Sequence, residues 1–246
     1  MRYLIVSDIH ANAQALEAVL YAAEGEYDLA LCLGDLVGYC ADPNPVVDWA
    51  RAGLRAIVRG NHDKVCVGLE GLEWFNPVAR AAAVWTMRVL SPANLTFLRD
   101  LPMGPVIVDQ FQILHGSPLD EDEYLVNSLD AMQLDGYLDR RVSFFGHTHL
   151  QGGFAFLRRG VQRLPKMSPK ESESALYLEP DAQYLINPGS VGQPRDGDPR
   201  AAFAIFYPDQ NALIFRRVAY DVEGAQKNIR DAGLPEALAR RLKLGQ

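Results

Sequence analysis

Every histidine in this chain follows an apolar, strand-like run of residues. A histidine with only a packing role would more often lie inside a helix or a strand. The histidines and their polar neighbours form five short motifs, which are Ser7-Asp8-Ile9-His10, Gly34-Asp35, Gly60-Asn61-His62-Asp63, Leu114-His115-Gly116 and Gly146-His147-Thr148-His149. Because functional side chains of α/β proteins collect beyond the carboxyl ends of strands, we expect the motifs to meet in one place.

The side chains in these motifs are of the types that bind metal ions. Imidazole nitrogens with carboxylate or amide oxygens suit Mn²⁺, Fe or Zn²⁺ better than Ca²⁺ or Cu⁺, and the motifs contain no thiolate that would indicate structural zinc. Five imidazoles, three carboxylates and one asparagine amide exceed the needs of one ion. We therefore expect two divalent ions, manganese before iron or zinc, about 3.5–4 Å apart and bridged by a carboxylate.

Glycine stands beside four of the motifs, at Gly34, Gly60, Gly116 and Gly146. A strand that turns sharply while its backbone stays close to a ligand leaves no room for a Cβ atom. One such glycine fits an ordinary turn equally well. Four of them beside potential ligands favour a shared site.

The residues around the motifs alternate between strand-like and helix-like patterns in the first half of the chain. Strands are expected at residues 2–7, 28–33, 55–58, 104–109, 111–114 and 142–145. Helix N-caps are expected at Asn12, Asn44, Asn76, Ser91 and Ser128, with Pro45 at the first helical position after Asn44. Helix 13–23 is the first of these helices.

The second half of the chain has mostly short strand-like segments. They are expected at residues 153–157, 175–178, 184–187, 201–207 and 212–218, followed by a helical stretch from Asp221. Residues 165–174 have low hydrophobicity and are expected to form a surface loop. Together these patterns predict an α/β protein with helix-covered sheets, as a single domain over residues 1–246.

Composition restricts the class of protein. The net charge of -7 and the pI of about 5.2 disfavour non-specific binding to nucleic acid. A nucleic acid is therefore expected only as a small substrate. The apolar start of the chain is too short for a signal peptide or a membrane span, so a cytoplasmic protein is expected. Three cysteines without CxxC spacing indicate neither a disulfide framework nor a zinc site.

The five motifs, in this order, resemble those of the calcineurin-like metallophosphoesterase superfamily. The continuations Asp8–Asn12, Gly34–Tyr39 and Asn187–Gly192 are similar to its small bacterial phosphodiesterase branch. Cys40 stands where that branch more often has glycine. The resemblance implies two packed mixed β-sheets flanked by helices, a metallophosphoesterase-like sandwich.

The resemblance also implies a role for each polar residue of the motifs. It assigns Asp8, His10 and His149 to the first metal, Asn61, His115 and His147 to the second, and Asp35 to a bridging position. His62 is left without a metal and would act as general acid for attack by a metal-bridging hydroxide. Asp63 would orient either His62 or the loop.

Three further residues are candidates for binding substrate. Asn12 either contacts substrate or only caps the helix at 13–23. Tyr39 lies in a loop that is either a pocket wall or a plain turn. Arg195 either grips a phosphate bidentately or pairs with neighbouring aspartates at the surface.

The expected function is metal-dependent hydrolysis of a small phosphoester, as a phosphodiesterase or phosphatase. Alternatives are a phosphatase for phosphoprotein or dinucleoside polyphosphate, and a catalytically idle metal-binding scaffold subunit. The presence of His62 argues against the scaffold, which needs no general acid. The sequence leaves homo-oligomer formation open.

Overall fold

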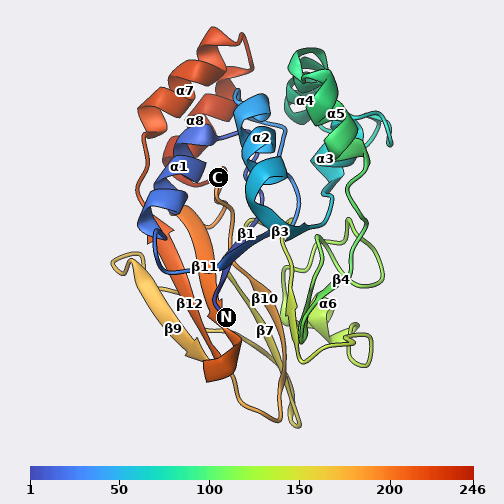
Figure 1. The fold of residues 1–246 in the computed structure, drawn as a ribbon, viewed down its shortest axis with the longest axis vertical. Coiled ribbons are helices and arrows are strands. Elements are labelled where there is room, and N and C mark those ends of the chain that lie inside the picture. The colour runs from blue at the N-terminus through green and yellow to red at the C-terminus, as the bar shows by residue number, and fades with distance from the viewer.

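The structure is a computed structural model that describes residues 1–246. Two mixed β-sheets of six strands each pack against one another at its centre (Figure 1). The first sheet has the order β3 (Leu54–Ile57), β2 (Leu29–Cys32), β1 (Tyr3–Val6), β11 (Ala201–Tyr207), β12 (Ala212–Val218) and β9 (Glu173–Tyr177). The second has the order β4 (Val106–Val108), β5 (Phe111–Ile113), β6 (Val142–Phe144), β10 (Gln183–Asn187), β7 (Gly152–Leu157) and β8 (Gly160–Arg163).

Strand β1 is buried on both faces because the sheet is covered on both sides. Successive side chains of a strand point to opposite faces. Tyr3 and Ile5 therefore enter the core between the two sheets, where they join Phe144 of β6. Leu4 and Val6 enter a second core with residues of the helices on the outer face. This two-sided burial explains the continuous apolar run in the sequence.

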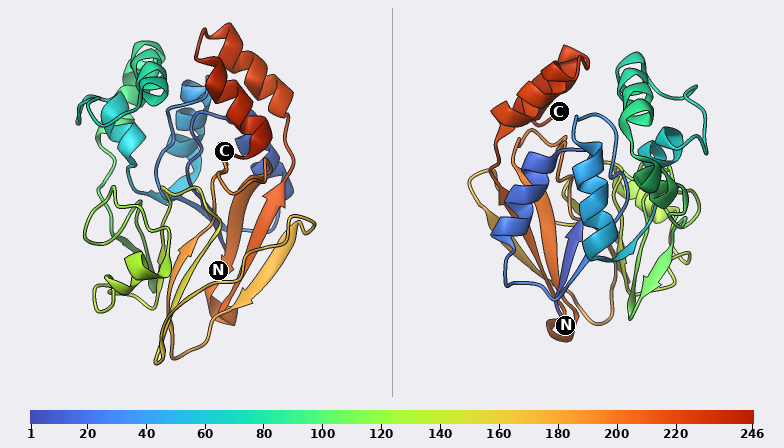
Figure 2. Two further views of the ribbon diagram at one scale, coloured as in Figure 1. Left: turned by 180° about the vertical axis from the view of Figure 1, so that it is seen from behind. Right: turned by 45° about the horizontal axis from the view of Figure 1, so that its top comes forward.

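Helices cover the sheets, and all of them except the short α6 gather toward one end of the molecule (Figures 1 and 2). They are α1 (Ala13–Ala22), α2 (Pro43–Gly53), α3 (Asn61–Cys66), α4 (Pro77–Val89), α5 (Pro92–Arg99), α6 (Ser128–Met132), α7 (Val222–Asp231) and α8 (Glu236–Leu244), with a 3-10 turn at Pro208–Gln210. The expected helix-flanked two-sheet α/β fold is confirmed. None of the helices has the length and apolar character needed to cross a membrane.

Parallel strands bring the motifs to one edge of the sheets. Strands β1, β2 and β3 are parallel neighbours in the first sheet, and β5, β6 and β10 are parallel neighbours in the second. The loops after them are joined by backbone hydrogen bonds, from Asp8 N to Gly34 O (3.0 Å) and from Gly146 N to His115 O (2.8 Å). The carboxyl ends of these strands thus build the floor of a common site.

Several local predictions were wrong. Helix α2 begins at Pro43 with Asp42 as its N-cap, and Asn44 instead accepts a hydrogen bond from Ser91 N, which joins α2 to the start of α5. The cap of α6 is Asn127, because its side chain forms a capping box with Asp130. Ser128 is the first residue of that helix.

The sequence analysis did not predict several other features of the fold. Helix α3 and strand β8 were not expected, and the C-terminal helical stretch is two helices, separated around Gly233 and Pro235. The expected loop at 165–174 overlaps the start of β9 at Glu173. The caps at Asn12, Asn76 and Ser91 are confirmed by side-chain hydrogen bonds to the first turns of their helices.

Candidate metal centre

The five motifs bring their ligand-type side chains into two neighbouring groups. The first group is Asp8, His10, Asp35 and His149, and the second is Asp35, His115 and His147, with the ligand atoms of each group within 4.8 Å of one another. Oδ2 of Asp35 lies 3.5 Å from Nε2 of His10 and 3.6 Å from Nε2 of His115. Asp35 thus belongs to both groups, the geometry needed for a bridging carboxylate.

The two histidines of the first group turn their Nε2 atoms toward each other, 3.1 Å apart. Their Nδ1 atoms face backbone carbonyls, Val37 O at 3.0 Å from His10 and Gln193 O at 2.5 Å from His149. A carbonyl oxygen only accepts, so Nδ1 carries the proton and Nε2 presents a lone pair. Burial lowers the pKa of both rings well below its ordinary value, which keeps them neutral.

Facing lone pairs of this kind repel one another unless a cation lies between them. The carbonyl that holds each Nδ1 is the usual outer partner of a metal-binding histidine, because it fixes both tautomer and ring orientation. Only part of this arrangement recurs in the second group, because a backbone carbonyl holds the His115 ring whereas Nε2 of His147 is buried without a hydrogen-bond partner. There, Nδ1 of His115 donates to Leu33 O over 2.7 Å, and its Nε2 lies 3.1 Å from Nδ1 of His147.

Asn61 completes the second group with an oxygen ligand. Its Oδ1 lies 3.4 Å from Nε2 of His115, and the residue begins helix α3 directly after Gly60. The second group therefore offers two imidazoles, a shared carboxylate and an amide oxygen. This mixed nitrogen and oxygen set suits a borderline divalent ion.

The buried carboxylates of the site require a nearby positive charge if they are to be ionised. Burial raises the pKa of Asp8 to about 7 and raises that of Asp35 well above its ordinary value. Oδ2 of Asp8 is buried and has no hydrogen-bond partner. Neutral imidazoles do not compensate buried carboxylates, whereas divalent cations would. The residues present therefore fit a metal centre.

The backbone at this site is held in an uncommon conformation. Nine non-glycine residues have positive φ, and five of them are ligand candidates, with φ between 49° and 64°: Asp8, His10, Asp35, His147 and His149. A positive φ is uncommon among non-glycine residues, and such conformations cluster at functional sites. The turns aim the ligands inward immediately after the strands end.

Two glycines make room for this packing. A Cβ atom on Gly60 would lie 2.1 Å from Oδ1 of Asp35, and one on Gly34 would lie 2.8 Å from Nδ1 of His115. Glycine is thus required beside these ligands, as the sequence predicted.

His62 lies beside the ligand groups, and its ring belongs to neither. The ring centroid is 4.9 Å from that of His10, 4.3 Å from Tyr39 and 4.6 Å from Phe75. Its Nδ1 is buried without a hydrogen-bond partner. Burial, with a contribution from the Arg195 charge, lowers the pKa of His62 well below its ordinary value.

Asp63 organises the loops around the ligands. Its carboxylate accepts hydrogen bonds from the backbone N–H groups of Asp35 (2.8 Å), Gly60 (3.0 Å) and Val37 (3.3 Å). No hydrogen bond joins it to the His62 ring. Of the two roles considered from the sequence, the structure favours positioning of the loop.

The segment from Asn187 to Gly192 fastens the ligand loops together. Asn187 donates to Gly146 O (2.8 Å) and to Oγ1 of Thr148 (3.0 Å), while Ser190 donates to Asp8 O (2.8 Å). Sequence reasoning noted this segment only for its family resemblance. It supports the motifs that carry Asp8 and His147 without supplying a ligand.

Asn12 has a structural role. Its Oδ1 accepts from Ala15 N at 3.1 Å, which confirms the N-cap, and its Nδ2 donates to Gly192 O at 2.9 Å. Both ends of the amide are therefore engaged within the chain.

Arg195 lies at the site and not at the surface among acidic residues. Its Nη2 donates to the Tyr39 hydroxyl at 3.2 Å and to Oε1 of Gln193 at 3.1 Å. The neighbouring Asp196 and Asp198 form ion pairs with other arginines. Of the two roles considered for Arg195, pairing with the neighbouring aspartates at the surface is therefore wrong, because these aspartates have partners of their own.

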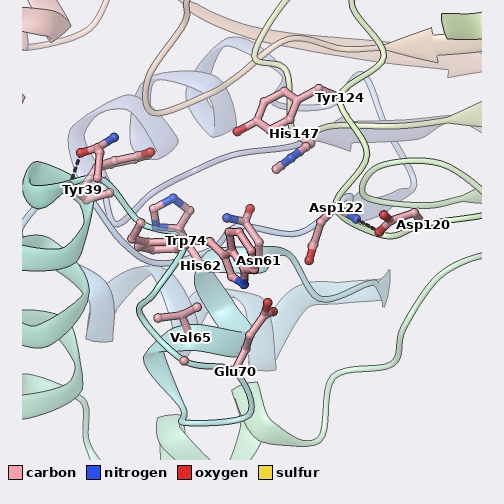
Figure 3. A pocket seen from close by; sticks show the side chains of 14 residues that line it. Tyr39, Asn61, His62, Val65, Glu70, Trp74, Asp120, Asp122, Tyr124 and His147 are labelled. Atoms are coloured by element: carbon pink, nitrogen blue, oxygen red, sulfur yellow. Dashed lines mark hydrogen bonds between the residues drawn. The ribbon is translucent and has the colours of Figure 1, made fainter.

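A pocket of about 360 Å³ opens beside the metal-ligand candidates (Figure 3). Asn61, His62 and His147 form its inner side, as Figure 3 shows. Its walls include the aromatic residues Tyr39, Trp74, Phe75 and Tyr124 and the acidic residues Glu70, Asp120 and Asp122. Tyr39 is thus a pocket wall, one of its two predicted roles, whereas Trp74 and Tyr124 come from loops that gave no signal in the sequence.

The chain matches one family model and one relative of nearly the same length. Residues 1–211 match the model of the calcineurin-like phosphoesterase superfamily domain. The chain is 37% identical to an uncharacterized protein of Methanocaldococcus jannaschii, over 98% of this chain and 97% of that protein.

Solved structures show the same fold. A metallophosphoesterase from Sphaerobacter thermophilus is 40% identical, with a TM-score of 0.86 over 100% of this chain and 99% of the other. A hypothetical protein from Pyrococcus horikoshii OT3 shares the fold at 18% identity, with a TM-score of 0.79 over 100% of this chain and 98% of the other.

Proposed function

The chain belongs to the calcineurin-like phosphoesterase superfamily, and we propose that it hydrolyses small phosphoesters with the help of two divalent metal ions. The observation that carries this proposal is the pair of ligand groups that share Asp35. We assign Asp8, His10 and His149 to one ion, Asn61, His115 and His147 to the other, and Asp35 to both. The nitrogen and oxygen donors suit manganese, iron or zinc, and we favour manganese.

Bound divalent ions supply Lewis acidity, which lowers the pKa of an attacking water and offsets charge on the phosphoryl oxygens. The chain's own contribution begins with His62. It lies between the ligand groups and the pocket, so its ring is placed to give a proton to the leaving oxygen. An anionic phosphoester beside the ring would raise the lowered pKa of His62, so that the proton is held when substrate is bound.

The pocket would receive the leaving group. Its aromatic walls provide apolar surface next to His62, and Trp74, which is 88% exposed, stands at its mouth. Three carboxylates also line it, and Lys64 pairs with Glu70 and Asp122 among them. A leaving group with a flat or apolar part fits these walls.

A hydrolysis assay with Mn²⁺, using bis-p-nitrophenyl phosphate and p-nitrophenyl phosphate, tests the proposal. We expect turnover of at least one ester, together with two bound ions per chain by elemental analysis. The competing function is a metal-binding scaffold subunit. Two bound ions with no hydrolysis of either ester, or of an extended panel of phosphoesters, would favour the scaffold.

A further inference from the structure

Helices α7 and α8 lie beyond residue 211, outside the segment that matches the family model, yet they reach the proposed active site. Figure 1 shows the two helices beside α1 at the end of the molecule where the helices gather. Leu238 and Leu242 of α8 pack in one buried cluster with Tyr39 and Cys40. The side chain of Cys40, where the family resemblance led us to expect glycine, thus contributes to the cluster that holds this helix pair.

The end of α8 is also tied to the segment that carries Arg195. Gly197 N donates to Gly245 O at 3.0 Å, just after α8 ends. Arg195 itself is held next to a ligand candidate, because its backbone N–H donates to His149 O at 3.3 Å. The C-terminal helices and the Arg195 segment therefore form one connected wall of the site.

Two guanidinium groups of this wall meet at one tyrosine. Cζ of Arg195 and Cζ of Arg241 each lie 5.6 Å from the centroid of the Tyr39 ring. Arg241 donates from Nε to Gln246 O, and neither arginine pairs with an aspartate or glutamate side chain within 4.0 Å. Nε of Arg195 is buried without a partner.

Like charges placed together at a partly buried site disfavour one another. Burial, followed by the Arg195 charge, lowers the pKa of Arg241 below its ordinary value. Arg230 of the adjacent helix α7, by contrast, pairs with Glu236. A bound anion would relieve the repulsion between Arg195 and Arg241, and guanidinium groups bind phosphate oxygens with directed hydrogen bonds.

We propose that Arg195, Arg241 and the Tyr39 hydroxyl form a second anion subsite, which selects phosphoesters that carry another phosphate group beyond the scissile one. This inference rests on the proposed function for its account of the scissile phosphate. It assigns to the C-terminal helices a role in substrate choice. Arg241 is a binding residue in this account, and it takes no part in the bond-breaking step.

Binding of non-hydrolysable probes to the Mn²⁺-loaded protein tests the subsite without relying on turnover. The probes are methylphosphonate and a series of alkylene diphosphonates with one to three methylene groups between the phosphorus atoms. We expect at least one diphosphonate to bind about tenfold or more tightly than methylphosphonate, the gain typical of a charge-assisted hydrogen bond.

Three variants separate charge from packing. Arg241→Met keeps a long apolar stem against Tyr39 and should abolish most of the diphosphonate gain while methylphosphonate binding stays within about twofold. Arg241→Lys should restore part of the gain because it keeps the charge. Arg240→Met, on the exposed neighbouring residue of the same helix, is the matched control and should change neither affinity.

The inference is overturned if no diphosphonate binds more tightly than methylphosphonate, or if Arg241→Met leaves the gain intact. It is also overturned if Arg241→Met weakens both probes equally at unchanged thermal stability. Failure of the proposed function is separable, because it would appear as absent phosphoester hydrolysis by a wild-type protein that still discriminates between the probes.

Discussion

Replacement of Gly38 by alanine should impair catalysis without removing metal. Gly38 has φ +89°, and a Cβ atom there would lie 2.4 Å from Nδ1 of His62. Ordinary contacts begin at 3.4 Å, so the His62 ring must move by about 1 Å (3.4 minus 2.4). A misplacement of about 1 Å can cost about 10²-fold in rate, which corresponds to about 2.7 kcal/mol of transition-state stabilisation.

Backbone strain is a second effect of this substitution, and Gly68→Ala controls for it. Gly68 has φ +74° and no atom within 4 Å of its Cβ position. Both variants should lose about 1–2 kcal/mol of folding stability from the left-handed conformation. Only Gly38→Ala should lose activity, because only its added methyl group meets the proposed proton donor.

The assay compares kcat/KM for two phosphodiesters, bis-p-nitrophenyl phosphate and a diester with an alkyl leaving group. The alkyl ester needs protonation of its leaving oxygen more, so its rate should fall further. Metal content by elemental analysis should stay at the wild-type value in both variants. The reasoning is refuted if Gly38→Ala and Gly68→Ala retain the same activity, or if both esters slow equally.

His62→Ala should keep both ions and lose about 10²–10⁴-fold in kcat, measured beside metal content; full activity would remove His62 from the mechanism. Asp35→Ala should lose at least one ion together with activity, since Asp35 belongs to both ligand groups; an elemental analysis that still finds two ions would contradict the bridging role. Arg195→Ala should lower kcat/KM by about tenfold for small phosphoesters that carry a second phosphate group, through the loss of a charge-assisted contact; unchanged steady-state kinetics with such an ester would exclude contact with substrate.

Much of the site could be predicted because its ligands are positioned by local chain features. Each motif follows a short apolar strand, and parallel strands place their carboxyl ends at the same edge, so Asp8 and Asp35 had to lie close together. The glycines beside the ligands indicated close packing. Gly60 shows this most directly, because a Cβ atom at that position would collide with the Asp35 side chain. These features depend on neighbours in the sequence or on strand order.

The parts that the sequence did not predict depend on contacts between distant segments. Asn44 is an adequate N-cap by residue type, but it bonds to Ser91 and Asn94, and the helix begins two residues earlier than predicted. Trp74 and Tyr124 line one pocket from loops some fifty positions apart in the chain. No local sequence pattern predicts such contacts, because they form only when distant segments of the chain have packed together.

Arg241 is the clearest example. In the sequence it is one of several basic residues in a C-terminal amphipathic helix, where a solvent-exposed arginine is the ordinary interpretation. Its contact with Tyr39 exists because α8 packs against the loop at residues 39–41. Helix packing thus turns a surface residue type into part of the wall of the site.

The central claim is that two cations share Asp35, and anomalous diffraction from crystals grown with Mn²⁺ tests it most directly. We predict two anomalous peaks about 3.5–4 Å apart on either side of the Asp35 carboxylate. One peak would lie among Asp8, His10 and His149, and the other among Asn61, His115 and His147. The absence of peaks at these ligands in a protein saturated with Mn²⁺, or a single peak that Asp35 does not contact, would contradict the account.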